Sequence, residues 1–302
     1  MFDSSLTKLR HRLLCRIGRR YRVVSEEVKF GGLSFPFTRI ADPDSVLDEV
    51  AAEADLRDRL AGSPAPDDQL HLPYWAELWE SARGVGAYLV GMDAEGGVVD
   101  AVTRGHGDAE RGVVDAETRR RADAGKKRGD AIFLSPRPRV PASPSLATPA
   151  SPRLAIPASS PSVLDLGCGM GMAGTVAAAL GAKVLFADLE PPALLFAQLN
   201  SLPWRDRVRT RRLNWQRDSL HERFNVILGA DILYERVQWD FLEPFWRAHL
   251  SDGGHVLLGE PGRQTGDMFV EWIIARGWNL TTTEIPVATR PKPIRIFRIS
   301  RQ

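Results

Sequence analysis

The sequence of 302 residues has few features of disulfide-rich, membrane-spanning or nucleic-acid-coating proteins. Two cysteines, Cys15 and Cys168, are too few for a disulfide scaffold and predict a reducing compartment such as the cytoplasm. No run approaches the roughly 18 apolar residues of a membrane helix, so we expect no membrane partner. Forty Lys+Arg against 38 Asp+Glu leave a net charge of +2. A protein that coats nucleic acid needs a larger positive excess, so nucleic acid is not the expected partner.

Proline is unevenly distributed, which indicates a low-complexity insert. Eight of the 21 prolines lie between Pro136 and Pro161, just after two near-identical stretches, DAEGGVVDAVTR and DAERGVVDAETR. We interpret residues 93–160 as a disordered insert, because repetitive segments with many charges and few aromatics cannot form a core. A docking role for its Pro/Arg part is the alternative.

Residues 1–70 predict a small α+β extension. Seven basic residues between Lys8 and Arg22 accompany a helically spaced apolar series from Leu6 to Ile17. A transit peptide or an RNA-contacting helix is possible, but we favour an amphipathic helix packed on the domain. Two alternating segments around Gly31-Gly32 predict a β-hairpin, and Asp42 or Asp44 can cap a following helix.

The segment 162–188 has the pattern of a βαβ unit. A short apolar strand, SVLDL, leads into GCGMGMAG and a helix, and a second strand, KVLFA, ends at Asp188. Glycines allow the backbone to approach a ligand closely, and the helix start offers free N–H groups. A carboxylate at the end of the second strand can accept both ribose hydroxyls.

Two ligand classes suit this unit. The spacing of Gly169, Gly171 and Gly174 matches the dinucleotide fingerprint, which by itself is a weak signal. Asp165, however, lies just before the glycines, where it repels a pyrophosphate and attracts a cationic headgroup. The residues therefore favour a ligand with a cationic headgroup, such as an α-ammonium beside a sulfonium.

VLDLGCGMG resembles motif I of the class I S-adenosylmethionine (SAM) methyltransferases. Asp231 and Tyr234 resemble the D-x-x-Y signature of the seven-β-strand lysine methyltransferases, and LPYWAELWES and LNW resemble two further segments of that group. GEPGR, which ends at Arg263, resembles the G-D-P-G-R of the electron-transfer-flavoprotein β-subunit lysine methyltransferases and their bacterial relatives. Two residues depart from these patterns: Asn214 and Glu260 stand where the group has Asp.

The resemblance implies SAM as cofactor and a protein substrate methylated on a lysine side chain. Its implied catalytic residues are Asp231 and Tyr234, which are expected one helical turn apart. Its implied SAM contacts are Trp79, Asp165, Gly167, Gly169, Asp188, Leu189, Asn214, Trp215 and Ala230. Asp165 and the glycines would hold the methionine end and Asp188 the ribose. The alternative for Asp165 is a strand-end carboxylate bound to turn amides.

Other candidate residues have competing structural interpretations. Trp75 and Trp79 are expected four residues apart on one helix, with Trp75 in the core and Trp79 against SAM. Trp215 is expected either beside adenine or in the core. Cys168 is interpreted as a packing residue, since no His accompanies it in the motif. The six histidines form no metal-ligand pattern, so no metal is expected.

The expected fold is an α/β domain with a Rossmann-like, mostly parallel seven-stranded sheet and helices on both faces. The strand–helix alternation after residue 163 predicts the parallel sheet, and the resemblance implies seven strands over residues 71–92 and 161–302. The expected reaction is direct attack of an amine on the SAM methyl, with Asp231 orienting the amine. A small-molecule N-methyltransferase and a non-catalytic SAM-binding protein are the alternatives; the sequence predicts no oligomeric state.

Overall fold

The computed structural model describes residues 4–61, 73–94 and 160–302. Nearly all of the predicted 93–160 insert lies outside these ranges, so neither interpretation of it is tested. Helix α3 (Glu80–Ala94) continues two residues past the predicted start of the insert. Among the described helices, none is both long and apolar enough to cross a membrane.

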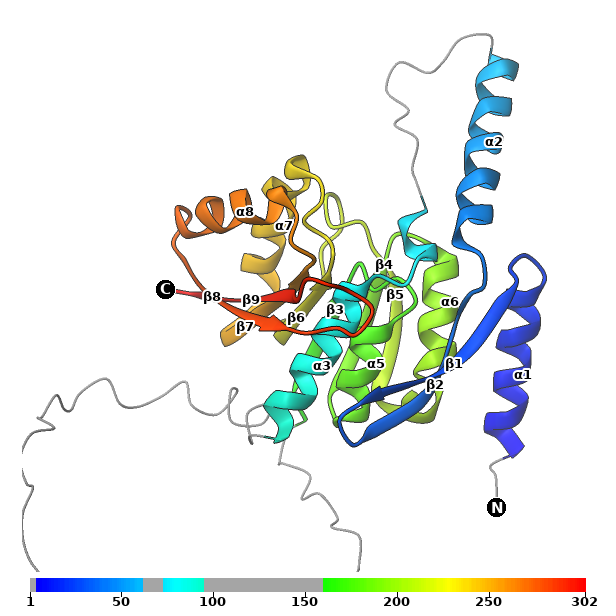
Figure 1. Cartoon of the computed structure of the whole chain (residues 1–302), viewed down its shortest axis with the longest axis horizontal. Helices are drawn as coiled ribbons and strands as arrows, with labels where there is room; N and C mark the ends of the chain where they lie inside the picture. Colours follow the sequence, from blue (N-terminus) through cyan, green and yellow to red (C-terminus); the bar gives the residue numbers. More distant parts are fainter. Residues whose placement is uncertain (1–3, 62–72, 95–159) are drawn as a thin grey trace, which may run out of the picture. The chain divides into compact units, whose positions relative to one another are not determined.

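The main sheet has seven strands in the order β5-β4-β3-β6-β7-β9-β8 (Figure 1). Its strands are β3 (Ser162–Leu166), β4 (Lys183–Asp188), β5 (Val208–Arg212), β6 (Phe224–Ala230), β7 (Leu250–Glu260), β8 (Trp278–Ile285) and β9 (Ile294–Arg301). The first five strands in that order pair in parallel, and β9 pairs antiparallel with both β7 and β8. The predicted fold class and the closing antiparallel pair are confirmed.

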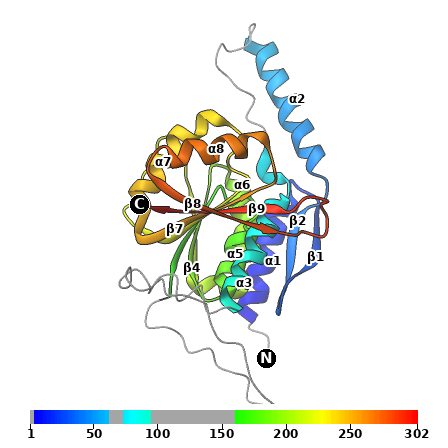
Figure 2. The same cartoon turned by 60° about the vertical axis from the view of Figure 1, so that its left-hand side comes forward.

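Alternate residues of the strands face two hydrophobic cores. On one face, Val163 and Phe186 pack with α3, α5 (Met172–Ala179) and α6 (Pro191–Asn200). On the other face, Leu164 and Leu185 pack with α7 (Arg236–His249) and α8 (Gln264–Ile274). Figure 2 shows these two helix layers on either side of the sheet. Burial on both faces explains why most residues of the central strands are apolar.

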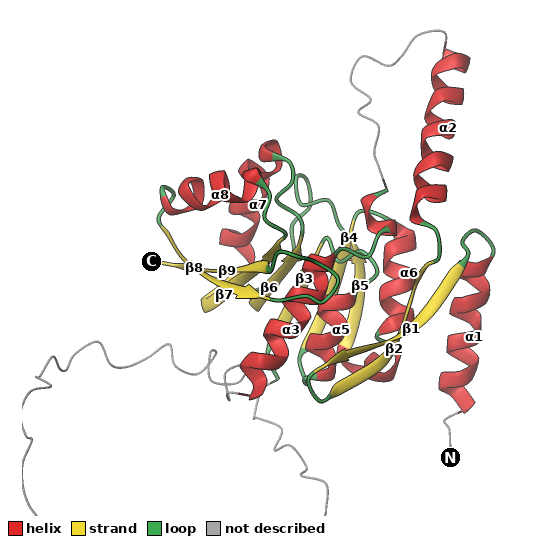
Figure 3. Cartoon of the chain, in the orientation of Figure 1, coloured by secondary structure: helices red, strands yellow, loops and turns green. Residues whose placement is uncertain are grey.

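The N-terminal extension consists of a helix, a hairpin and a second helix. These elements are α1 (Ser4–Gly18), β1 (Val23–Phe30), β2 (Leu33–Ile40) and α2 (Pro43–Ala61). The hairpin forms a separate two-stranded sheet (Figure 3), whose turn has Gly31 at φ 55°. The side chain of Asn200 on α6 accepts a hydrogen bond from the Thr38 amide and donates one to its carbonyl, so the hairpin is tied to the main domain.

Helix α1 is amphipathic, as predicted. Leu13 and Ile17 are buried in the core shared with α6, and the basic side chains of the helix are exposed. Leu9 is the exception in the predicted apolar series, because its side chain is exposed. The arrangement supports packing on the domain over a free arm, since two large apolar side chains leave water there.

Candidate active site

The glycine-rich turn after β3 has backbone angles that only glycine adopts without strain. Gly167, Gly169 and Gly171 have φ values of 64°, 51° and 84°. Gly174 is required for a different reason: a Cβ there would lie 2.4 Å from the Phe186 ring and 2.7 Å from Oδ2 of Asp165. The turn thus brings α5 unusually close to the carboxyl ends of β3 and β4.

Asp165 is buried directly under this turn. Its Oδ2 accepts a hydrogen bond of 2.9 Å from the Gly174 amide, and the residue is 2% exposed. Burial raises the pKa of Asp165 to about 7; the Gly174 hydrogen bond opposes this rise and the nearby Asp188 adds to it. This hydrogen bond fits the alternative interpretation of Asp165, a strand-end carboxylate bound to turn amides. A direct contact of Asp165 with a ligand stays a prediction.

Asp188 ends β4 on the same edge of the sheet. Its two oxygens accept hydrogen bonds from the amides of Gly169, at 2.8 Å, and Glu190, at 2.9 Å. Burial raises the pKa of Asp188 to about 6, and both amide hydrogen bonds oppose that rise. The Leu189 amide also interacts with the carboxylate, whose two oxygens together have four lone pairs. The neighbouring Leu189 is half-buried, and its carbonyl accepts a hydrogen bond from Arg212.

Asn214 and Trp215 lie in the loop after β5. The Asn214 side-chain oxygen accepts a hydrogen bond from the Gln216 amide, so this part of the side chain organises the loop. Trp215 is half-buried, packs against the α7–α8 core and donates its indole N–H to Gln238. Its ring also lies 3.5 Å from the position that a Gly167 Cβ would occupy. Part of the Trp215 ring therefore packs in the core, as one of its two interpretations predicts. The contact of the other ring edge, beside Gly167, with a ligand stays a prediction.

Asp231 follows β6 and Ala230 in a conformation rare for a non-glycine residue, with φ 57°. Its amide donates to the Gly259 carbonyl, which fixes the backbone at the carboxyl end of β7. Its carboxylate accepts two hydrogen bonds from Arg263, of 3.1 Å from Nε and 2.7 Å from Nη2. Strained backbone of this kind is frequent at functional sites.

The structure corrects two local expectations. Trp75 and Trp79 are not on one helix: Trp75 lies in a 3₁₀ turn (Tyr74–Ala76), Glu77 is extended, and Trp79 precedes α3. The indole N–H of Trp79 donates to the Tyr74 carbonyl and holds the chain in this turn. Trp75 is a core residue, as predicted, with its ring edge against Tyr21.

Tyr234 was expected one helical turn from Asp231, but α7 begins only at Arg236, so the segment between them is a loop. The Tyr234 ring packs against Tyr74 at 5.1 Å between centroids. Burial raises the pKa of Tyr234 to about 12, which keeps its hydroxyl protonated at neutral pH.

Asp231 lines a pocket of about 300 Å³ between the start of α3 and the end of β7. Trp79, Glu80 and Ser81 form one wall, and the turn ending at Arg263 together with Arg290 forms the other. The Ser81 hydroxyl is buried and has no hydrogen-bond partner among the described residues, so it is available to a ligand. Arg263 and Arg290 were not among the predicted site residues; the GEPGR segment was the available signal for Arg263.

Cys168 packs against the core beside the glycine turn, and burial raises the pKa of its thiol. This agrees with its interpretation as a packing residue, because a nucleophilic cysteine needs a lowered pKa. Among the described residues, no three His, Cys, Asp or Glu side chains are grouped to hold a metal ion.

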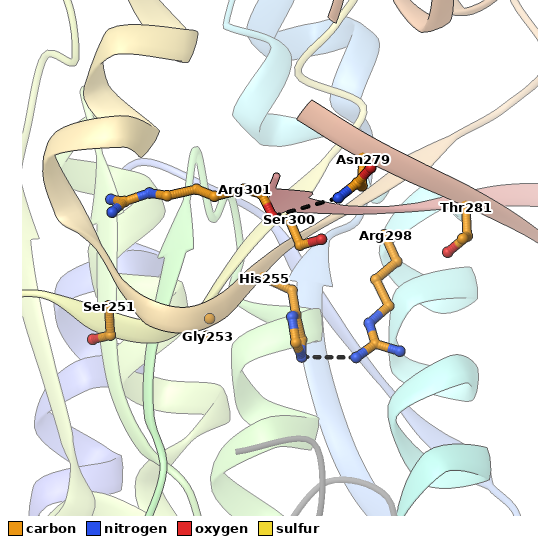
Figure 4. Close-up of a pocket in the computed structure, with 9 residues that line it drawn as sticks. Ser251, Gly253, His255, Asn279, Thr281, Arg298, Ser300 and Arg301 are labelled. Carbon is orange, nitrogen blue, oxygen red and sulfur yellow. Dashed lines mark hydrogen bonds between the residues drawn. The ribbon is translucent and has the colours of Figure 1, made fainter. Parts of the chain in front are cut away.

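A slightly larger pocket, of about 340 Å³, lies where β7 starts, at the other end of that strand from Glu260 (Figure 4). Its lining includes His255 and Arg298, whose guanidinium donates to Nε2 of His255 at 2.9 Å. Burial and Arg298 lower the pKa of His255 to about 4. None of the predicted site residues lines this pocket.

Comparisons with known proteins found similarity over the part of the chain that contains these residues. Residues 153–270 match the family model described as lysine methyltransferase. The matched segment contains the glycine turn, Asp165, Asp188 and Asp231.

Individual relatives are similar to about a third of the chain. Protein N-lysine methyltransferase METTL21A of Xenopus tropicalis is 42% identical over 105 residues, 32% of this chain and 47% of that protein. METTL21A of Danio rerio is 38% identical over 104 residues, with the same shares. The chain thus spans about half the length of the curated relatives it matches. The glycopeptide N-methyltransferase MtfA, solved with SAM, covers 48% of this chain and 82% of its own, with 16% identity and a TM-score of 0.43.

Proposed function

We propose that this protein is a SAM-dependent N-methyltransferase that modifies a lysine side chain of a protein substrate. The observation that carries the proposal is the position of Asp231, whose buried carboxylate lines a pocket on the same sheet edge as the glycine turn. The family match and the similarity to METTL21A, a protein N-lysine methyltransferase, support protein lysine as the acceptor. The resemblance to the electron-transfer-flavoprotein β-subunit lysine methyltransferases rests on the GEPGR segment alone and stays a prediction.

The residues at the glycine turn fit the predicted cofactor. Asp188 is a carboxylate at the end of β4, a position that suits the hydroxyls of a ribose. Positive φ at Gly167 and Gly169 leaves no side chain between the backbone and a ligand. Trp79, Leu189, Asn214, Trp215 and Ala230 complete the proposed contacts. SAM, when bound, supplies a methyl group on a positively charged sulfur.

The proposed work of this chain's own residues is positioning. A lysine amine has an ordinary pKa of about 10.4 and reacts only when neutral. Asp231 would accept a hydrogen bond from this amine and stabilise the cation that forms on it. Tyr234, with its ring against Tyr74, would form the aromatic side of the channel. No covalent intermediate on the protein is required.

Tritiated SAM added to the purified chain with cell lysate tests the function. A labelled protein band that contains methyl-lysine by mass spectrometry is the expected result. A labelled small molecule instead would support the small-molecule N-methyltransferase alternative. No label in either fraction, with SAM binding intact by calorimetry, would support the non-catalytic alternative.

Two substitutions test the assigned roles against each other. Asp231→Asn is expected to keep SAM binding and to lose at least 100-fold in methyl transfer, because the amine loses its charged acceptor. Asp188→Ala is expected to weaken SAM binding by about 100-fold, since two hydrogen bonds to a charged group are lost. Unchanged turnover in Asp231→Asn, or unchanged affinity in Asp188→Ala, would contradict the corresponding role.

The cytoplasm is the proposed location. It rests on the cysteine content of the chain, and both thiols are free in the structure. Fractionation of the host cell, followed by immunoblotting, would test it.

A further inference from the structure

Arg263 and Asp231 form the best-defined ion pair at the candidate site. The guanidinium donates from two nitrogens to the two carboxylate oxygens, a forked geometry that few other side chains can reproduce. The Asp231 side chain is only 4% exposed. The Arg263 guanidinium also lies over the Trp79 ring, 5.7 Å from its centroid. The cation is thus held between the proposed catalytic carboxylate and one wall of the pocket.

A second network holds the backbone of Arg263. Glu260 accepts hydrogen bonds from the amides of Gly262, at 2.8 Å, and Arg263, at 2.5 Å. Glu260 is itself buried and paired with Arg295 of β9. The longer side chain that replaces the family's Asp at position 260 therefore builds the turn that presents Arg263. The Arg295–Glu260 ion pair and the hydrogen bonds of Glu260 to the turn thus connect β9 to the Arg263–Asp231 pair.

We infer that Arg263 is a positioning residue that compensates the charge of Asp231, so that the pocket accepts the substrate amine in its neutral form. The inference rests on the proposed lysine methyltransferase function. A free, buried carboxylate would stabilise an incoming ammonium ion and keep its proton in place. A carboxylate already paired with Arg263 presents a neutral pair, yet it retains lone pairs for one N–H of a neutral amine.

Among the described groups around the pair, Arg263 is the cation that compensates the charge of Asp231. Its hydrogen bonds to Asp231 raise the pKa of Arg263, so it is charged at every assay pH. The other charged or titratable groups around the pair are Tyr74 and Glu77 before α3, Glu80 at its start, Tyr234 after β6, Glu260 at the end of β7 and Arg290 before β9. Arg290 also lines the pocket, but its guanidinium donates to the Pro261 carbonyl rather than to Asp231.

The rate of label transfer from tritiated SAM, measured from pH 6.5 to 9.5, tests the inference. The acceptor is a heat-treated pool of lysate proteins at a saturating concentration. The pH dependence of the rate then reports the ionisation of the bound amine. The variants are Arg263→Gln and Arg263→Lys. Arg276→Gln is a matched control, because Arg276 also pairs with an aspartate, Asp240, and lies over a tryptophan ring, Trp272. Arg263 and Arg276 have the same side-chain exposure of 41%.

The wild-type rate is expected to rise with pH as the amine loses its proton. Arg263→Gln should move this rise to higher pH by about one unit, since one nearby positive charge is lost. Arg263→Lys should leave the pH of the rise unchanged, because the positive charge stays. Its rate should fall by about tenfold, because lysine cannot make the two forked hydrogen bonds to Asp231. The Arg276→Gln profile should superimpose on that of the wild type.

A lower rate in Arg263→Gln with an unmoved profile would overturn the inference and reduce Arg263 to a structural support of the turn. Thermal melting of each variant shows whether the fold is intact. If Arg263→Gln does not fold, a displaced profile in Arg263→Lys overturns the inference and an undisplaced one supports it. No label from the wild-type chain at any pH would instead contradict the proposed function itself.

Discussion

Asp165→Asn is expected to make the ligand-free protein more stable at pH 8. Burial raises the pKa of Asp165 from its ordinary 3.8 to about 7. The folded chain therefore binds a proton between these values that the unfolded chain has lost, and stability falls as pH rises from 4 to 7. The full cost of the ionised carboxylate above pH 7 is about 4 kcal/mol.

Asparagine removes this charge and keeps an oxygen for the Gly174 amide. Its NH₂ group is left without a partner in a buried place, which costs about 2 kcal/mol. The net gain at pH 8 is therefore about 2 kcal/mol. The gain should shrink by about 1.4 kcal/mol per pH unit below pH 7 and disappear near pH 5.

Urea unfolding at pH 8, 6.5 and 5 measures this difference, with Asp206→Asn as control because the Asp206 side chain is 92% exposed. An Asp165→Asn variant that is less stable than the wild type at pH 8, or a difference that does not change with pH, would refute the reasoning. The same variant should bind SAM at least tenfold more weakly, because a carboxylate that is costly in the free protein is retained for its ligand.

Two further substitutions follow from the packing. Gly174→Ala should destabilise the protein by about 3 kcal/mol and weaken SAM binding, because its Cβ would overlap Phe186 and Asp165; equal melting temperatures would contradict this. The wild-type chain should lose about 2 kcal/mol of stability at His255 between pH 7 and 5, since unfolded histidine takes up a proton that the folded residue, with its pKa of about 4, does not. His255→Gln should remove that part of the acid sensitivity in urea unfolding, and an identical pH dependence in both proteins would count against it.

The central part of the fold could be predicted because its signals are local. Strand, glycine turn and helix between Ser162 and Asp188 follow from apolar runs and from glycines at positions of positive φ. The parallel order of β3, β4 and β6 then places Asp165, Asp188 and Asp231 at one sheet edge, since side chains that end parallel strands meet there. The pairing of β8 with β9 followed from their alternating pattern.

Local signals failed where a short segment depends on distant contacts. The spacing of Trp75 and Trp79 allowed a helix, but Trp75 is buried against Tyr21 while Trp79 is held by the Tyr74 carbonyl. These different partners require a 3₁₀ turn and an extended residue in place of one helix. The loop between Asp231 and Tyr234 has a similar cause, because the Tyr234 ring packs against Tyr74.

By itself, the sequence determined the order of the elements, the sheet edge of the site and the acids that end its strands. Only the tertiary structure decided which groups those acids face. Asp165 proved to be buried under the Gly174 amide, and Asp231 proved to be paired with Arg263, 32 residues further along the chain. The second pair depends on how the ends of β6 and β7 lie side by side. No residue spacing within either segment predicts the distance between Asp231 and Arg263.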